Sequence, residues 1–100
     1  MSDILRDYEM IVIAAPQLDE EGLTNLTERV SGWITGAKGT VSNTDVWGRR
    51  SLAYAIKKQT EGYYVQFNFQ LLPSASRELD RNLRLDENVI RHLVIRLDEE

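Results

Sequence analysis

The chain has 100 residues, of which 42% are hydrophobic and 28% charged, and its net charge is −4. Such a length and composition predict one globular domain over residues 1–100, with a short extension at 1–5 and a short acidic end at 98–100. The lack of cysteine excludes disulfides and cysteine-based metal sites, and a single histidine, His92, excludes a multi-histidine metal centre. The longest apolar run, residues 10–15, is much shorter than the roughly 20 residues that span a membrane. Since the N-terminus also lacks the features of a secretory signal, we expect a cytoplasmic protein.

A strand and a helix are predicted first along the chain. Residues 8–15 form an apolar, β-branched run that Pro16 stops, which is typical of a central strand covered on both faces. Asp19 suits the N-cap of the helix that follows, and Gly36 and Gly39 indicate its end. Apolar residues recur in between at three- and four-residue spacing and define one helix face: Leu23, Leu26, Val30, Trp33 and Ile34.

Two extended segments are predicted next. Residues 40–58 alternate in polarity, except near Gly48, where the break indicates a bulge. Residues 59–62 are predicted to form the turn, with Gly62 at positive φ. Residues 63–72 then alternate strictly, so one set of side chains is expected to face the helices: Tyr63, Val65, Phe67, Phe69 and Leu71.

The last part of the chain predicts a second helix and a final strand. Pro73 starts a helix through about Leu85, and a turn at 86–88 leads to a strand at 89–96. The order strand, helix, strand, strand, helix, strand predicts an α+β, ferredoxin-like split βαβ sandwich. In this fold a four-stranded antiparallel sheet carries both helices on one face, with the first and third strands at its centre.

Residues that would carry catalysis are not apparent in the sequence. No nucleophile and base can be paired, and the segment after the first strand, residues 16–18, is not a glycine-rich phosphate loop. The regular aromatic set of this strand, Tyr63, Phe67 and Phe69, shares its parity with Val65 and Leu71 and is expected to face the helices, so it does not predict the base-stacking platform of single-stranded RNA readers. We therefore expect neither enzymatic activity nor a cofactor or metal.

A local basic patch lies in the middle of this acidic chain. Residues 31–69 hold five basic and two acidic side chains, a net charge of +3. Trp47, Arg49 and Arg50 flank Gly48, where a bulge would aim consecutive side chains in different directions, and Lys57 and Lys58 follow. Taken alone, the patch is compatible both with phosphate binding beside an aromatic ring and with a solvated strand edge that resists aggregation.

The same region carries a family motif. Residues 48–57 read Gly-Arg-Arg-Ser-Leu-Ala-Tyr-Ala-Ile-Lys, and they are similar to the signature of the bacterial small-subunit ribosomal protein six family. Residues 6–9, 61–64, 83–84 and 88–91 also resemble segments of that family. The resemblance extends from about Arg6 to Arg96, in the family's order and spacing.

The resemblance implies a ferredoxin-like, non-enzymatic component of the cytoplasmic ribosome. It implies binding to the central domain of small-subunit ribosomal RNA, jointly with small-subunit ribosomal protein eighteen, and a basic partner would help an acidic chain to approach RNA. Two alternatives remain at this point: a ferredoxin-like ligand-binding or regulatory dimerisation module without RNA, and a structural adaptor without RNA contact. With Trp47 added from the patch, the candidate residues facing RNA or the partner are Arg6, Trp47, Arg49, Arg50, Lys57, Lys58, Arg84 and Arg91.

Overall fold

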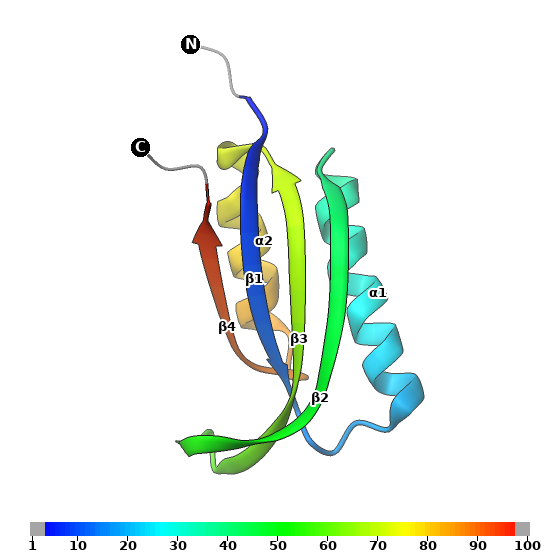
Figure 1. Ribbon diagram of the computed structural model, residues 1–100, viewed down its shortest axis with the longest axis vertical. Helices are drawn as coiled ribbons and strands as arrows, with labels where there is room; N and C mark the ends of the chain where they lie inside the picture. Colours follow the sequence, from blue (N-terminus) through cyan, green and yellow to red (C-terminus); the bar gives the residue numbers. More distant parts are fainter. Residues whose placement is uncertain (1–3, 98–100) are drawn as a thin grey trace.

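Four strands and two helices form a two-layer structure in the computed structural model, which describes residues 4–97. In chain order they are β1 (Arg6–Ala14), α1 (Glu20–Gly36), β2 (Thr40–Ile56), β3 (Gln59–Leu71), α2 (Pro73–Leu85) and β4 (Val89–Arg96). The sheet order is β2-β3-β1-β4 with antiparallel neighbours, and both helices lie on one side of it (Figure 1). The predicted ferredoxin-like fold and the central position of the first and third strands are confirmed. The predicted acidic end at 98–100 and residues 1–3 lie outside the described part.

The core lies between the sheet and the two helices. Along the central pair of strands, Met10 is opposite Phe67 and Tyr8 is opposite Phe69, and all four side chains are buried. The Tyr8 and Phe69 rings stack with their centres 5.4 Å apart. The predicted inward face of residues 63–71 is therefore confirmed, and the helices cover it with Leu26, Val30, Ile34, Leu79 and Leu83.

The start of α1 follows the predicted capping pattern. The Asp19 side chain accepts a hydrogen bond of 2.7 Å from the backbone N–H of Gly22, which satisfies one of the free donors of the first turn. Glu20 and Glu21 lie in that first turn, where the helix dipole favours negative charge. Within residues 4–97, neither helix is long and apolar enough to cross a membrane.

The position of the β2–β3 turn differs from the prediction. The chain reverses at Lys57 and Lys58, which have φ values of +51° and +67°. The residues on either side of this turn, Ile56 of β2 and Gln59 of β3, are paired with each other. Positive φ at both central residues is the geometry of a two-residue type I′ turn, whose twist suits a hairpin. The prediction of a turn at 59–62 was wrong because lysine rarely adopts positive φ, so the sequence does not mark Lys57 and Lys58 as turn residues.

Gly62 lies inside β3 instead, opposite Arg50. A Cβ atom on Gly62 would lie 2.5 Å from Cγ2 of Ile13 and 3.0 Å from the carbonyl oxygen of Ala14. The glycine is thus needed for the close approach of β3 to β1, and not for a turn.

The predicted irregularity at Gly48 is confirmed. Gly48 has a φ of +98°, and the register between β2 and β3 shifts between Val46 and Gly48. Such a bulge increases the local twist of the strands. Beyond it, the end of the hairpin turns across the lower end of the sheet toward β4 (Figure 1).

Candidate functional site

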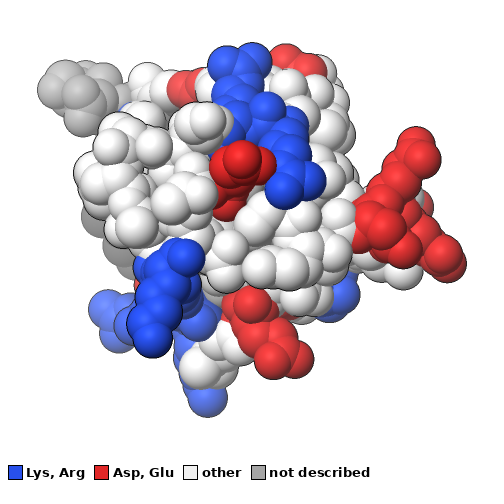
Figure 2. All heavy atoms as spheres, turned by 90° about the horizontal axis from the view of Figure 1, so that it is seen from below, with Lys and Arg blue, Asp and Glu red and all other residues white. Residues whose placement is uncertain are grey.

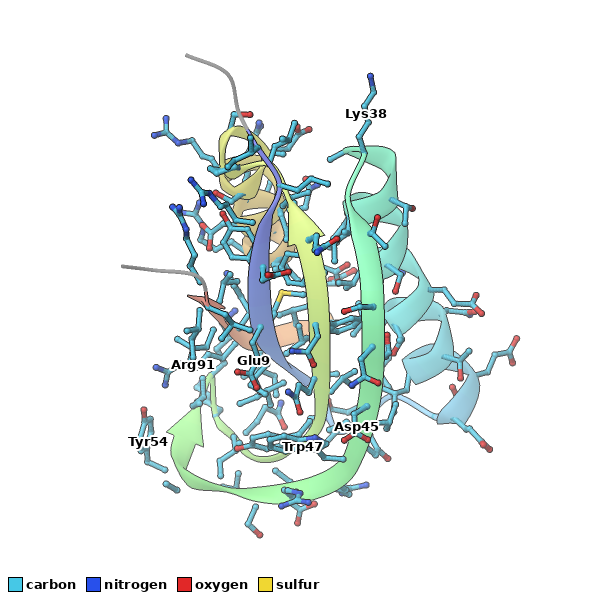
Figure 3. All side chains as sticks on the ribbon, turned by 45° about the horizontal axis from the view of Figure 1, so that its top comes forward. Glu9, Lys38, Asp45, Trp47, Tyr54 and Arg91 are labelled. Atoms are coloured by element: carbon cyan, nitrogen blue, oxygen red, sulfur yellow. The ribbon has the colours of Figure 1, made fainter. Side chains whose placement is uncertain are left out.

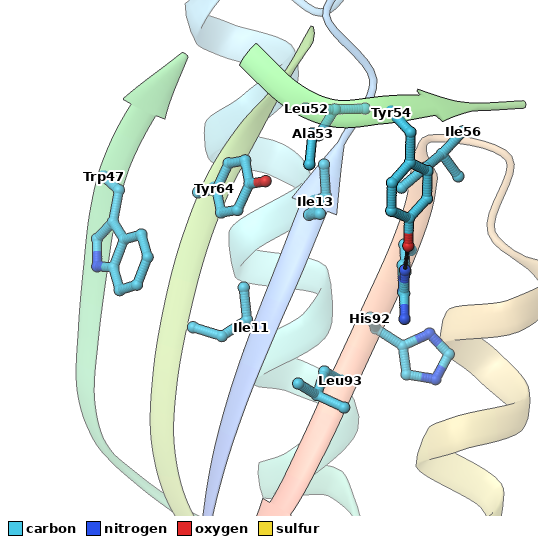
Figure 4. A pocket seen from close by; sticks show the side chains of 11 residues that line it. Ile11, Ile13, Trp47, Leu52, Ala53, Tyr54, Ile56, Tyr64, His92 and Leu93 are labelled. Carbon is cyan, nitrogen blue, oxygen red and sulfur yellow. Dashed lines mark hydrogen bonds between the residues drawn. The ribbon is translucent and has the colours of Figure 1, made fainter. Parts of the chain in front are cut away.

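A concavity lies on the open face of the sheet, the face without helices, where the curled hairpin overhangs the strands. Its volume is about 290 Å³. Ile11 and Ile13 of β1 and Leu93 of β4 form its floor, and Leu52 and Ile56 of the hairpin lie above them (Figure 4). The lining is mostly apolar, so this surface is suited to bury apolar groups of another molecule.

Trp47 and Tyr64 form one wall of the concavity. Their rings are almost parallel, at 2°, with centres 6.0 Å apart. The guanidinium carbon of Arg50 lies 5.3 Å from the centre of the Trp47 ring, within the range of a cation–π contact. Arg50, Trp47 and Tyr64 therefore place a positive charge beside two flat aromatic surfaces on the open face.

Arg49 lies on the other side of the hairpin. Its Nε donates a hydrogen bond of 2.5 Å to Oε1 of Glu61, and its guanidinium carbon lies 5.7 Å from the centre of the Tyr63 ring. The hydrogen bond to Glu61 and the attraction of that carboxylate raise the pKa of Arg49 above its ordinary value. The predicted divergence of the two consecutive arginines at the bulge is thus confirmed, and among the side chains of residues 4–97 a carboxylate lies against Arg49 but not against Arg50.

Arg91 and Tyr54 form the opposite wall. Nη1 of Arg91, on β4, donates a hydrogen bond of 2.8 Å to the hydroxyl oxygen of Tyr54 on the hairpin. Figure 3 shows both side chains on the same flank of the molecule, and Figure 4 shows the bond between them. This contact joins the free end of the hairpin to the edge strand of the sheet.

The remaining candidate residues occupy three separate places. Lys57 and Lys58 are exposed at the hairpin turn. Arg6 lies at the start of β1, opposite Leu71, at the far end of the strand from the hairpin. Arg84 lies on α2 and forms an ion pair of 3.1 Å with Asp80. The fold thus gathers Trp47, Arg49, Arg50, Lys57 and Lys58 on one hairpin, here called the hairpin surface, with Arg91 beside it.

The charges at this end of the molecule do not form one continuous patch. Residues 46–62 hold four basic side chains and one acidic side chain, Glu61, a net charge of +3. Figure 2 shows the lower end of the molecule, where Lys and Arg side chains form separate groups with Asp and Glu side chains between and beside them. A polyanion would therefore find local groups of positive charge here, and not an extended basic surface.

Sequence reasoning missed several residues of this site. Tyr64 had a signal, because its parity is opposite to that of Phe67 and Phe69, which places its ring on the open face. Tyr54 and Leu93 had no local signal, since their role depends on the hairpin lying over β4. His92 lies on the helix side, where its Nε2 is 2.7 Å from Oδ1 of Asp80. Residues 4–97 contain no group of three or more His, Asp or Glu side chains that would hold a metal ion.

Comparison with known proteins gives one consistent family. A family model described as ribosomal protein S6 matches residues 7–96. The small ribosomal subunit protein bS6 of Clostridium botulinum (strain Hall) is 47% identical over 91 residues, which cover 91% of this chain and 97% of that protein. The protein of the same name from Caldanaerobacter subterraneus subsp. tengcongensis is 44% identical over 95 residues, covering 95% of this chain and all of the relative. A crystal structure of 30S ribosomal protein S6 from Thermotoga maritima has a TM-score of 0.88 and 35% identity, and the match covers 94% of this chain and 89% of that one.

Proposed function

The chain belongs to the ribosomal protein S6 family, and from this membership we propose that it binds small-subunit ribosomal RNA of the central domain jointly with small-subunit ribosomal protein eighteen. It is a structural component of the small ribosomal subunit, and its cellular place is therefore the ribosome in the cytoplasm. Its role is to position and stabilise RNA without catalysing a reaction.

The observation that carries this proposal is the concentration of positive charge on the hairpin surface of an acidic chain. The net charge of the chain is −4, whereas residues 46–62 have a net charge of +3. Phosphate contacts depend on such local groups of Lys and Arg. Arg50 supports the proposal most strongly, because its guanidinium lies over Trp47 and has no carboxylate beside it among the contacts of residues 4–97.

A protein partner fits the neighbouring concavity. Its floor is apolar, and Leu93 in this floor is 52% exposed. Apolar side chains of a partner would bury this surface. A basic partner would also compensate the acidic side chains that separate the Lys and Arg groups in Figure 2, which makes joint binding to RNA more favourable than binding of this chain alone.

The alternative of a small-molecule site has less support. Such sites need several convergent polar groups that are free to bind the ligand. In this concavity Arg91 and Tyr54 are bonded to each other, and the neighbouring His92 has its ring on the helix side, bonded to Asp80. A ligand would have to replace these hydrogen bonds, whereas an apolar protein side chain would leave them intact.

The test compares two arginine variants in assembly on RNA. Arg50→Ala should weaken binding to a central-domain ribosomal RNA fragment in the presence of the partner protein, and it should flatten the dependence of log K on log[salt] by about 0.7–0.9 per lost phosphate contact. Arg49→Ala should have a smaller effect, because its guanidinium is already engaged by Glu61. Affinity is measured by filter binding or fluorescence anisotropy from low to moderate salt.

Lys38→Ala is the matched control, since Lys38 is an exposed cation in the loop between α1 and β2, away from the hairpin. It should change neither affinity nor salt slope by a comparable amount. If the unmodified chain and the partner together do not bind the RNA fragment, the proposed function is wrong. If they bind and both arginine variants behave as the control does, the hairpin surface is a solvated edge and RNA contacts another face.

A further inference from the structure

The outer side of α2 carries a row of arginines that the hairpin surface does not include. Arg77, Arg81 and Arg84 are spaced by four and three residues, so they lie on one side of the helix, and all three are exposed. Leu79 and Leu83, on the opposite side, are buried against the core. The three positive charges therefore point away from the rest of the domain.

Within residues 4–97, only one of the three arginines of this row forms an ion pair. Among residues 4–97, Arg77 and Arg81 form no hydrogen bond or ion pair. Arg84 is 3.1 Å from Oδ2 of Asp80, and Oδ1 of the same carboxylate is bonded to His92. Like charges at this spacing weaken a helix. Such an arrangement costs stability in the free chain, and an anion bound along the row would relieve the repulsion.

We propose that Arg77, Arg81 and Arg84 bind phosphates of ribosomal RNA and form a second RNA-contacting surface, separate from the hairpin surface. This inference rests on the proposed RNA binding of the chain and extends it to another element. The helical rise separates the three residues by about 6 Å and about 4.5 Å along the axis, so neighbouring phosphates of one strand can be contacted in sequence. Every basic residue of α2 is arginine, whose planar guanidinium binds phosphate through two parallel hydrogen bonds.

The row also connects in space to the other candidate residues. Asp80 joins Arg84 to His92 on the edge strand β4, and the next residue, Arg91, reaches the open face and bonds to Tyr54 of the hairpin. Only the edge strand therefore separates the arginine row from the hairpin surface. An RNA strand that passes around the edge of β4 would contact both surfaces without crossing the acidic N-terminal turn of α1.

The experiment measures the salt dependence of RNA binding for single and double variants. The probe is a labelled central-domain fragment of small-subunit ribosomal RNA, with and without the partner protein. Arg77→Gln and Arg81→Gln should each make the negative slope of log K against log[salt] shallower by about 0.7–0.9, and the double variant should make it shallower by about twice that amount. Arg77→Lys with Arg81→Lys should restore most of the slope, since the phosphate charge contact is retained.

Lys38→Gln is the charge-matched control, because it removes one exposed positive charge from the opposite end of the fold to the hairpin turn. Urea melts should show that the α2 variants are folded and no less stable than the unmodified chain. If no chain binds the RNA, both the proposed function and this inference are wrong. If Arg50→Ala flattens the salt slope but the α2 variants do not, or if they weaken only the complex with the partner protein, RNA binding stands and the inference is overturned.

Discussion

His92 lies under α2, and its ring makes a contact that links a single side chain to the stability of the fold. Its Nε2 donates to Oδ1 of Asp80 over 2.7 Å, and the His92 side chain is only 13% exposed. This hydrogen bond holds the pKa of the Asp80 carboxyl below its usual value, and the charges of His92 and Arg84 add to the effect. The contact joins α2 to β4. Because it depends on the negative charge of the carboxylate, it stabilises the folded chain only while Asp80 is ionised.

We predict that the contribution of the Asp80 carboxylate to the free energy of unfolding disappears in acid. The unfolded chain binds a proton at Asp80 at a higher pH than the folded chain, so stability rises with pH through this interval. Compared with Asp80→Asn, the unmodified chain should be more stable above about pH 4, by no more than about 1 kcal/mol because water screens the half-exposed carboxylate. The advantage should vanish as the pH falls through the lowered pKa.

Urea melts at about pH 5.5 and about pH 2.5 measure this difference, since these values lie on the two sides of an ordinary aspartate pKa. Asp45→Asn removes an exposed carboxylate on the open face of β2 and is the control. A constant difference between the unmodified chain and Asp80→Asn at both pH values would show that the carboxylate is not stabilised by His92.

At the scale of the elements, Gly62 of β3 and Gly32 of α1 occupy positions with different physical demands. Gly62 lies where β3 approaches β1, and a side chain there would overlap Ile13 and the backbone of Ala14. Gly32 lies within α1, and a Cβ atom there would meet no other atom within 4 Å. The same substitution should therefore have opposite effects in the two elements.

Gly62→Ala should destabilise the fold by about 1–3 kcal/mol, because the backbone of a packed sheet must shift to admit the methyl group. Gly32→Ala should stabilise it by up to about 1 kcal/mol, since alanine favours the helix interior. Denaturant midpoints of the two variants provide the measurement. Tolerance of alanine at position 62 without loss of stability would mean that β3 and β1 are further apart than described.

At the scale of the whole molecule, one core joins all layers of the fold. Phe67 is 1% exposed and lies on the central strand β3, opposite Met10 of β1 and Thr44 of β2. The cluster around it includes residues of β1, β3, β4 and both helices. The hairpin, in contrast, extends beyond this core and contributes to the 44 Å length of the molecule. The fold is therefore stabilised away from the hairpin surface, whereas α2 contributes to the core with Leu79 and Leu83 on the side opposite its arginine row.

Phe67→Ala should cost about 3–5 kcal/mol, the usual loss for a buried phenylalanine, because the surrounding layers cannot close the cavity. Gln70→Ala is the control on the same strand, since its exposed side chain should change stability by about 0.5 kcal/mol or less. Urea melts monitored by circular dichroism compare the two. A loss below about 1 kcal/mol for Phe67→Ala would contradict the core described here.

The sequence alone determined the order of elements, the layer arrangement and the two faces of β3. Each of these depends on information carried by neighbouring residues: alternation at residues 63–71, helical spacing from Leu23 to Ile34, and the cap at Asp19. Burial of one face is the largest favourable contribution to folding, so the pattern that specifies it is readable along the chain. The family resemblance was equally local, because its main motif lies within residues 48–57.

The distribution of the candidate residues in space follows from the tertiary structure and not from the local sequence. Arg91 and Tyr54 are 37 positions apart, and their bond exists because the hairpin curls over the edge of the sheet. The turn at Lys57 and Lys58 follows from the pairing of β2 with β3, which overrides the local preference of lysine for negative φ. The arginine row of α2 became a candidate surface once the helix was placed beside β4, since charge acts through distance in space and not through separation along the chain.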